Sequence, residues 1–101
     1  MDRFTALGDP TRRAIIDLLA AEARPAGAIA RNFESSAPAI SQHLKVLRET
    51  GLVRVSREGT KRIYRLDPKA LDEMEEWVAR TRAKWNRRLD ALGQAMENEE
   101  N

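Results

Sequence analysis

The chain contains no cysteine, so it can form neither a disulfide nor a thiolate metal site. No apolar run approaches the roughly 20 residues that a membrane-spanning helix needs, and we expect no membrane partner. The first residues, MDRFTALGDP, include acids but no hydrophobic segment, which argues against a secretory signal and for a cytoplasmic protein. A single histidine, with no glycine-rich phosphate loop and no recognisable nucleophile–base pair, argues against an enzyme, and we expect no cofactor.

What is present fits one folded domain of 101 residues, with 42% hydrophobic and 34% charged residues. The charge is divided unevenly along the chain. Residues 1–66 hold 12 Lys and Arg against 7 Asp and Glu, whereas residues 67–101 hold 6 against 9. A basic body with a more acidic end indicates that the body meets a polyanion. The alternative is a chance segregation of charge.

Caps, prolines and glycines predict where each element begins and ends. Asp9 and Asp67 each precede a proline, the pattern of a helix start, and Gly51 marks a helix end. The first three expected helices are at about 2–7, 10–23 and 26–32, and a fourth helix, capped by Ser35 or Ser36, ends at 51. Two strands follow, 52–56 and 62–66, joined by a hairpin tip at 57–61. A last helix is expected at about 68–96. This order predicts a mainly α fold with a small β-hairpin, that is, a winged helix-turn-helix with a long C-terminal helix.

The fourth helix carries the strongest functional signal. Ile40, Leu44 and Leu47 fall on one stripe that must face the core, which leaves Gln42 and Lys45 on the opposite side with Ser41 on a flank. A glutamine can form a bidentate pair with adenine in the major groove, and serine and lysine can reach phosphates. Solvated surface polarity is the alternative, but the position of this helix after a turn and before a basic hairpin favours DNA recognition.

The hairpin is rich in cations. It holds five cations within twelve residues and one acid, Glu58; the cations are Arg54, Arg57, Lys61, Arg62 and Arg65. Side chains near the tip can follow a DNA backbone or enter a minor groove. The alternative is a cationic sheet edge that discourages aggregation, and both explanations are compatible.

The last helix has an apolar stripe close to a heptad seam, formed by Leu71, Met74, Val78, Thr81, Trp85, Leu89, Leu92 and Met96. The stripe could pack on its own domain, but its length favours a second copy of the chain. A two-fold partner places two recognition helices about one DNA turn apart, roughly 34 Å. Acids at 72, 73, 75 and 76 are interpreted as partners of the helix dipole rather than as metal ligands.

Three runs resemble the ArsR/SmtB family of repressors: residues 6–13 (ALGDPTRR), residues 41–53 (SQHLKVLRETGLV), and Gly59 with residues 63–66 (IYRL). The resemblance spans about residues 3–68. It implies a homodimer built from the first and last helices that binds an inverted-repeat operator. It also implies that residues 36–45 contact DNA with the 57–62 wing beside them.

The residue patterns and the resemblance together give two sets of candidate residues. Those for double-stranded DNA are Ser35, Ser36, Ala37, Pro38, Ser41, Gln42, His43, Lys45, Arg57, Lys61 and Arg62. Those for the dimer interface are Phe4, Leu7, Leu71, Met74, Val78, Trp85, Leu89 and Leu92. The expected organisation is one domain, residues 1–101, with the helix-turn-helix at about 26–50, the wing at about 52–66 and dimerisation helices at about 2–7 and 68–96.

The chain departs from the metal-sensing members of the family that it resembles. Ala26, Gly27 and Ala28 stand where those members have Cys-x-Cys, and the last helix has no histidine. Residues 85–90 (WNRRLD) resemble the metal-independent branch, and we expect no metal; any inducer stays unidentified. Two alternatives stay open, a winged-helix module that binds proteins and a metal-responsive repressor that uses carboxylate ligands.

Overall fold

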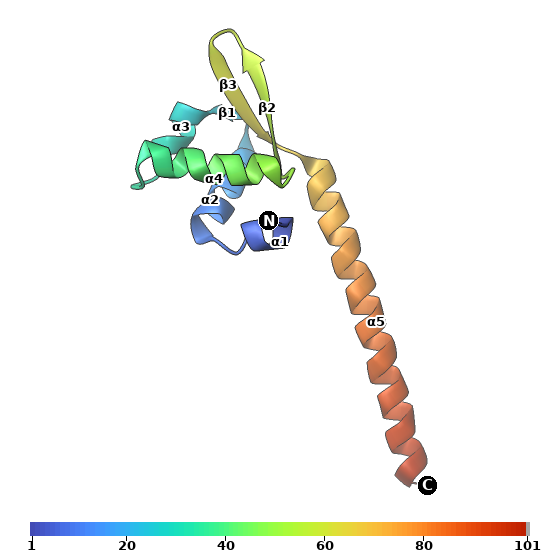
Figure 1. The fold of residues 1–101 in the computed structure, drawn as a ribbon. Helices are drawn as coiled ribbons and strands as arrows, with labels where there is room; N and C mark the ends of the chain where they lie inside the picture. Colours follow the sequence, from blue (N-terminus) through green and yellow to red (C-terminus); the bar gives the residue numbers. More distant parts are fainter. Residues whose placement is uncertain (101) are drawn as a thin grey trace. The chain divides into compact units, whose positions relative to one another are not determined.

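The computed structural model describes residues 1–100 of the chain. Its elements are α1 (Arg3–Ala6), α2 (Pro10–Ala21), β1 (Arg24–Pro25), α3 (Ala26–Ala30), α4 (Ala37–Glu49), β2 (Val53–Glu58), β3 (Lys61–Leu66) and α5 (Pro68–Glu100) (Figure 1). The mainly α fold with a helix-turn-helix, a small antiparallel sheet and a long last helix is the one that the sequence predicts. The chain forms two compact units, Met1–Ala70 and the residues from Leu71 onward.

Aspartates begin the helices as the sequence predicts. The side chain of Asp9 accepts hydrogen bonds from the backbone N–H groups of Thr11 at 2.8 Å and Arg12 at 3.1 Å. Asp67 accepts in the same way from the N–H of Lys69 at 3.0 Å, at the start of α5. These bonds satisfy amide groups that the first turn of a helix otherwise leaves unpaired.

The Asp9 cap makes the stability of the first unit depend on pH. The hydrogen bond from the Arg12 amide, with smaller contributions from the electrostatic interactions of Asp9 with His43 and Arg12 and from the Thr11 amide, lowers the pKa of Asp9 although burial opposes it. The native state therefore favours the ionised carboxylate, and this stabilisation is lost as the pH falls below about 4.

We expect Asp9→Asn to retain the cap, because asparagine is an equally good N-cap, and to weaken this acid dependence. Urea unfolding followed by circular dichroism at pH 6 and pH 3 measures it. The wild type should lose more of its free energy of unfolding between these pH values than the variant, although Asp2 keeps a similarly lowered pKa through its bond to the Thr5 amide. Equal losses would contradict the role of Asp9.

The sheet has the strand order β1-β3-β2, and both pairings are antiparallel. The predicted five-residue hairpin tip is wrong: the ladder continues to the pair Glu58 and Lys61, which leaves only Gly59 and Thr60 as the turn. Opposite charges on directly facing positions favour this extension. Gly59 has a φ of +65°, the conformation that the first central position of a type II′ turn requires.

The strand β1 was not predicted. The sequence predicted only a helix that ends near residue 23, and α2 does end before Arg24, at Ala21. In the structure Arg24 and Pro25 lie beside β3, with Arg24 opposite Tyr64. Proline is tolerated there because β1 is at the edge of the sheet.

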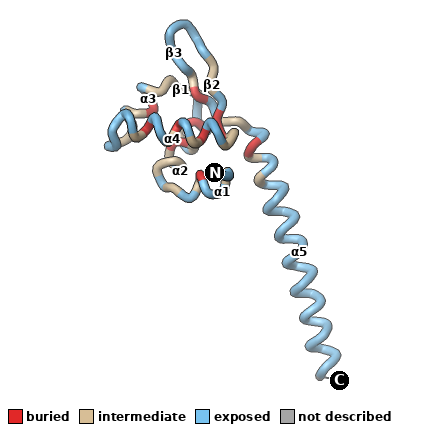
Figure 2. The backbone as a smooth tube through the Cα atoms, viewed as in Figure 1, coloured by how far each residue is buried: buried red, intermediate tan, exposed pale blue. Residues whose placement is uncertain are grey.

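The core lies in the first unit, where the helices meet the base of the sheet (Figure 2). Its largest fully buried side chains are Ile15, Ile29, Ile40, Leu44, Leu47, Leu52 and Val53. Ile16 and Leu18 of α2, beside the buried Ile15 and Leu19, are only half-buried. Both strands and helices therefore hold α4 from one side and leave its other side uncovered.

The helix α5 contains 33 residues, which corresponds to a length of about 50 Å. It continues to Glu100 rather than ending near Met96 as expected. No glycine or proline follows Gly93, so nothing in this segment terminates a helix.

Candidate nucleic-acid interface

The helix α4 begins with a short, small and exposed segment. Ser36 is its N-cap, and the side-chain oxygen accepts a hydrogen bond from the N–H of Ala39 at 3.3 Å. Pro38 follows in the first turn, where it removes no helical hydrogen bond. Ser35, Ser36, Ala37 and Pro38 are all exposed, so the backbone of this end can approach another molecule closely.

The body of α4 has two clearly different faces. Ile40, Leu44 and Leu47 retain at most 1% of their exposure and fix the helix against the core. Gln42 and Lys45 are exposed on the other side. The core packing thus aims the polar face outward, as the periodicity predicts.

His43 differs from its neighbours on α4 because it is half-buried and lies beside α2. Its Nδ1 atom is 3.3 Å from Nη1 of Arg12. An arginine can only donate, so Nδ1 accepts this hydrogen bond and the ring carries its proton on Nε2. The contact with α2 engages one ring nitrogen inside the protein and leaves the other as the only one that could meet DNA.

Arg12 and Arg13, from the resemblance run at residues 6–13, also have structural roles. Nε of Arg12 donates to the carbonyl oxygen of Ala6 at 2.6 Å, and Nη1 of Arg13 donates to that of Leu7 at 2.9 Å. These two side chains tie the end of α1 to the start of α2. The run is therefore accounted for by caps and loop contacts near α4 rather than by a reaction centre.

The C-terminal end of α4 is held firmly. The N–H of Leu52 donates to the oxygen of Leu47, and the N–H of Gly51 donates to that of Arg48, both at 3.0 Å. Together with the φ of +78° at Gly51, these bonds form a Schellman motif. Nε of Arg3 donates to the Thr50 oxygen at 2.9 Å and links this end to α1.

The hairpin cations fall into two groups. Arg54 pairs with Asp67 and Arg65 pairs with Glu58, each at 2.9 Å. Arg57, Lys61 and Arg62 are exposed and have no carboxylate partner among the residues that the structure describes. The three unpaired cations are those that the sequence nominated for DNA.

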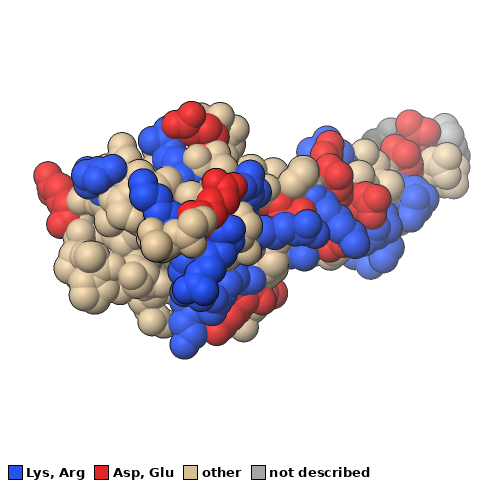
Figure 3. Space-filling model, turned by 90° about the horizontal axis from the view of Figure 1, so that it is seen from above, with Lys and Arg blue, Asp and Glu red and all other residues tan. Residues whose placement is uncertain are grey.

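The ladder register separates these three cations further. Arg57 and Arg62 are directly opposite each other on β2 and β3, so their side chains share one face of the hairpin. Lys61 is one residue away from Arg62 and lies on the other face. Figure 3, a view from the side of the hairpin tip, shows basic side chains in clusters with fewer acids between them.

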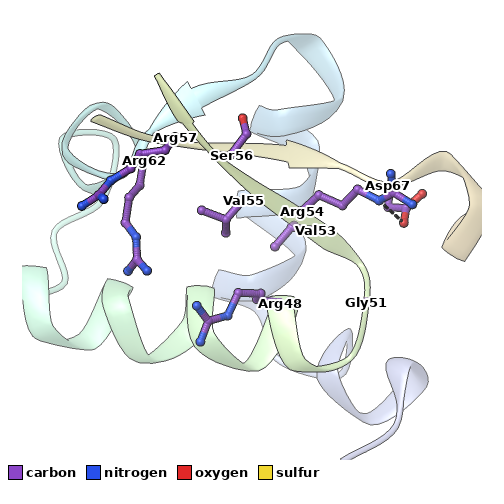
Figure 4. A pocket seen from close by; sticks show the side chains of 9 residues that line it. All are labelled: Arg48, Gly51, Val53, Arg54, Val55, Ser56, Arg57, Arg62 and Asp67. Carbon is purple, nitrogen blue, oxygen red and sulfur yellow. Dashed lines mark hydrogen bonds and ion pairs between the residues drawn. The ribbon is translucent and has the colours of Figure 1, made fainter. Parts of the chain in front are cut away.

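One cation of this region was not among the predicted residues. Arg48 is exposed and lines, with Arg57 and Arg62, an open cavity of about 740 Å³ between α4 and the hairpin (Figure 4). Its spacing from Ser41 and Lys45, at i+7 and i+3, places it on the same stripe of α4. That spacing was the available signal, but the sequence alone does not show that the hairpin meets this stripe.

The second unit carries an uncovered apolar stripe. Val78, Trp85, Leu89, Leu92 and Met96 are between 40% and 58% exposed, while Leu71 and Met74 are half-buried. In the first unit, the predicted interface residue Phe4 is also exposed, and Leu7 is half-buried. Such contiguous apolar surface on a helix is typical of an interface.

Among residues 1–99, whose side chains the structure describes, no three side chains of histidine, aspartate or glutamate gather in a way that could hold a metal ion. None of the helices within residues 1–100 is both long and apolar enough to cross a membrane.

Comparison with known proteins places these features in a family. A model described as a helix-turn-helix domain matches residues 7–56. The chain is 42% identical over 96 residues to the HTH-type transcriptional regulator Rv2034 of Mycobacterium tuberculosis, covering 95% of this chain and 87% of that protein. It is 39% identical over 75 residues to the transcriptional repressor SdpR of Bacillus subtilis, covering 74% and 83%.

Solved structures agree with the sequence relatives. An ArsR-like transcriptional regulator from Rhodococcus sp. RHA1 has a TM-score of 0.84 and 34% identity, covering 90% of this chain and 86% of that chain. A homodimeric winged helix-turn-helix DNA-binding domain from Mycobacterium bovis, a possible ArsR-family regulator, has a TM-score of 0.63 and 35% identity over 74% and 72%.

The winged helix-turn-helix architecture and the exposed polar face of α4 agree with the matches over most of the chain. Proteins of this kind are transcriptional regulators with a DNA-binding domain and are not enzymes, as the sequence predicted. The chain belongs to the ArsR family of winged helix-turn-helix transcriptional regulators.

Proposed function

We propose that the chain is a repressor that binds an inverted-repeat DNA operator as a homodimer. The observation that carries the proposal is the outward polar face of α4, which lies on the same unit as a hairpin with three unpaired cations. The Bacillus subtilis relative is a transcriptional repressor, which favours repression over activation.

In this proposal α4 enters the major groove. The small segment Ser35–Pro38 lets its N-terminus approach the bases, Gln42 pairs with an adenine, and Ser41 and Lys45 contact a base edge or phosphates. His43 contributes through Nε2, because its Nδ1 is engaged by Arg12.

The hairpin acts as the wing beside the recognition helix. Arg57, Lys61 and Arg62 supply charge for the phosphate backbone, and their places on two faces of the hairpin let them reach different phosphates. Arg54 and Arg65 are excluded from this role because each is paired with a carboxylate of the chain.

The dimer forms through the apolar stripe of α5, together with Phe4 of α1 and Leu7, which caps the end of α1. The stripe has a mirror symmetry: the spacings between Leu71, Met74 and Val78 are repeated in reverse between Trp85, Leu89 and Leu92. An antiparallel pair of α5 helices with its two-fold axis midway between Thr81 and Arg82 therefore sets Val78 opposite Trp85 of the second copy, a small side chain against a large one. The two-fold axis of the protein predicts the two-fold symmetry of the operator.

Selection of bound fragments from random duplex DNA tests the proposal. We expect a recovered site with two inverted half-sites whose centres are separated by about one helical turn. The same site should occur in DNA upstream of a regulated gene and give a discrete complex that survives random competitor. Failure to enrich any sequence, with a protein that is folded and dimeric, would contradict the proposal.

The substitution Gln42→Ala is expected to reduce discrimination at one base pair of each half-site. Loss of a bidentate contact costs about 1–3 kcal/mol against the correct base and almost nothing on a random duplex. Competition binding on the selected site and on single-base variants measures this effect.

The matched comparison is Arg62→Ala, which removes a phosphate contact and should weaken specific and random duplexes about equally. If Gln42→Ala instead lowers the affinity for both kinds of duplex by the same factor, Gln42 does not read a base.

A further inference from the structure

The open cavity between α4 and the hairpin is unusually rich in arginine. Four arginines are among the residues that line its space of about 740 Å³: Arg48, Arg54, Arg57 and Arg62 (Figure 4). Asp67 is the only carboxylate among the lining residues. The cavity therefore has a large excess of positive charge before any binding partner is considered.

Pairing within the chain removes one positive charge. The carboxylate of Asp67 bonds Nε of Arg54 at 2.9 Å and also caps α5. Arg48, Arg57 and Arg62 have no carboxylate partner in the part of the chain that the structure describes. Three uncompensated guanidinium groups thus border one cavity.

Two of these arginines are placed where folding alone disfavours them. Arg57 and Arg62 are Cα partners in the ladder, and like charges directly opposite each other destabilise an antiparallel pair. A cationic edge that resists aggregation would need neither this pairing nor a third arginine from another element. The arrangement is explained by an anion that binds between them.

The cavity wall is also rigid enough to hold such an anion. Arg48 is in the last turn of α4, which the Schellman bonds and the Arg3 side chain fix in place. The C-terminal end of a helix repels anions, but these bonds occupy its last carbonyl oxygens. Val53, at the base of the hairpin, is 2% exposed and anchors β2 in the core.

We propose that this cavity binds one phosphate group of the DNA backbone, held jointly by Arg48 of α4 and by the pair Arg57 and Arg62 of the hairpin. The inference rests on the proposed function, and it adds a contact at the opposite end of α4 from the base-reading residues. Planar guanidinium groups suit phosphate because each offers two parallel donors. The phosphate joins the recognition helix to the wing and fixes the position of both on the duplex without reading sequence.

Single neutral linkages in the operator test the proposal. Methylphosphonates are placed one at a time along the selected operator, and the affinity of the dimer is measured for each duplex. For the wild type we expect one backbone position in each half-site at which neutralisation lowers affinity about tenfold. This loss of affinity should depend on the arginines of the cavity.

At that position Arg48→Ala and Arg62→Ala should each lose most of the sensitivity, because the contact is already missing. Their effects on the unmodified operator should be less than additive in the double variant, since both residues hold the same group. Arg65→Ala is the matched control: it removes one positive charge from the same hairpin, but its guanidinium is paired with Glu58. It should keep the full wild-type sensitivity.

The outcomes distinguish a failure of the proposed function from a failure of the cavity assignment alone. If the wild type binds no DNA, the proposed function fails and this inference fails with it. If the wild type binds its operator but Arg48→Ala keeps wild-type sensitivity at every backbone position, only the assignment of the cavity is overturned.

Free phosphate is the other source of the same chemistry. Titration of the DNA-free dimer with inorganic phosphate, followed by the arginine Nε–H signals in NMR spectra, should show only weak binding in the millimolar range. Micromolar binding that depends on Arg48 would overturn DNA as the source and assign the cavity to a small phosphorylated ligand.

Discussion

Replacing Trp85 and Leu89 together with glutamate is expected to convert the dimer into monomers and to lower operator affinity by about 10²–10⁴-fold. Both side chains lie on the apolar stripe of α5 and are 58% and 47% exposed in the single subunit. Their replacement should therefore leave the folding of the subunit itself intact. Four carboxylates in a paired seam would be buried without partners. Without the dimer each half-site must be bound separately, which removes the gain from binding two linked half-sites.

Sedimentation velocity measures the first effect, and gel shifts on one and on two half-sites measure the second. The matched control is Ala83→Glu with Gln94→Glu, which adds the same charge on the opposite side of α5. This control should remain dimeric and bind normally. A dimeric Trp85 and Leu89 variant would show that the stripe is not the interface.

The absence of native cysteine allows a direct test of how the helices pair. In the antiparallel arrangement a cysteine at position 81 lies next to its own copy, so Thr81→Cys should cross-link on oxidation. Val78→Cys alone should not, but a mixture of Val78→Cys and Trp85→Cys should. Cross-linking of Val78→Cys with itself would indicate a parallel pair instead.

The sequence predicted the parts of the fold that local chemistry decides. Asp9 and Asp67 before prolines and Gly51 at a helix end marked helix boundaries to within about two residues, because caps act within a single turn. The predicted hairpin turn was too long because glutamate and lysine are generally depleted in strands, whereas here Glu58 and Lys61 face each other across the ladder.

Contacts between distant segments could not be predicted from the sequence. The pairing of Arg12 with His43 joins residues 31 positions apart, and β1 exists only because β3 passes beside it. The same limit explains why Arg48 was missed. The role proposed for Arg48 depends on the position of the hairpin near the end of α4, which no local pattern encodes.

Operator binding is expected to weaken about 10³–10⁵-fold when the salt concentration rises from 50 to 200 mM, the second of the two largest effects. Each subunit presents five exposed cations on α4 and the hairpin without a carboxylate partner in the described chain: Lys45, Arg48, Arg57, Lys61 and Arg62. Two subunits therefore offer up to ten phosphate contacts. Each neutralised phosphate releases condensed counterions, which contributes about −0.9 to the slope of log affinity against log salt.

Fluorescence anisotropy across a salt series measures this slope, which should lie between about −5 and −9. Arg62→Ala should make it shallower by nearly two, because each dimer loses two contacts, while Arg65→Ala should leave it unchanged because that charge is already balanced by Glu58. A wild-type slope shallower than about −3 would leave fewer than four phosphates neutralised per dimer. The unpaired cations of α4 and the hairpin would then face solvent in the complex. In that case the presence or absence of an ion pair within the chain, as for Arg54 and Arg65, would not distinguish structural arginines from those that bind DNA.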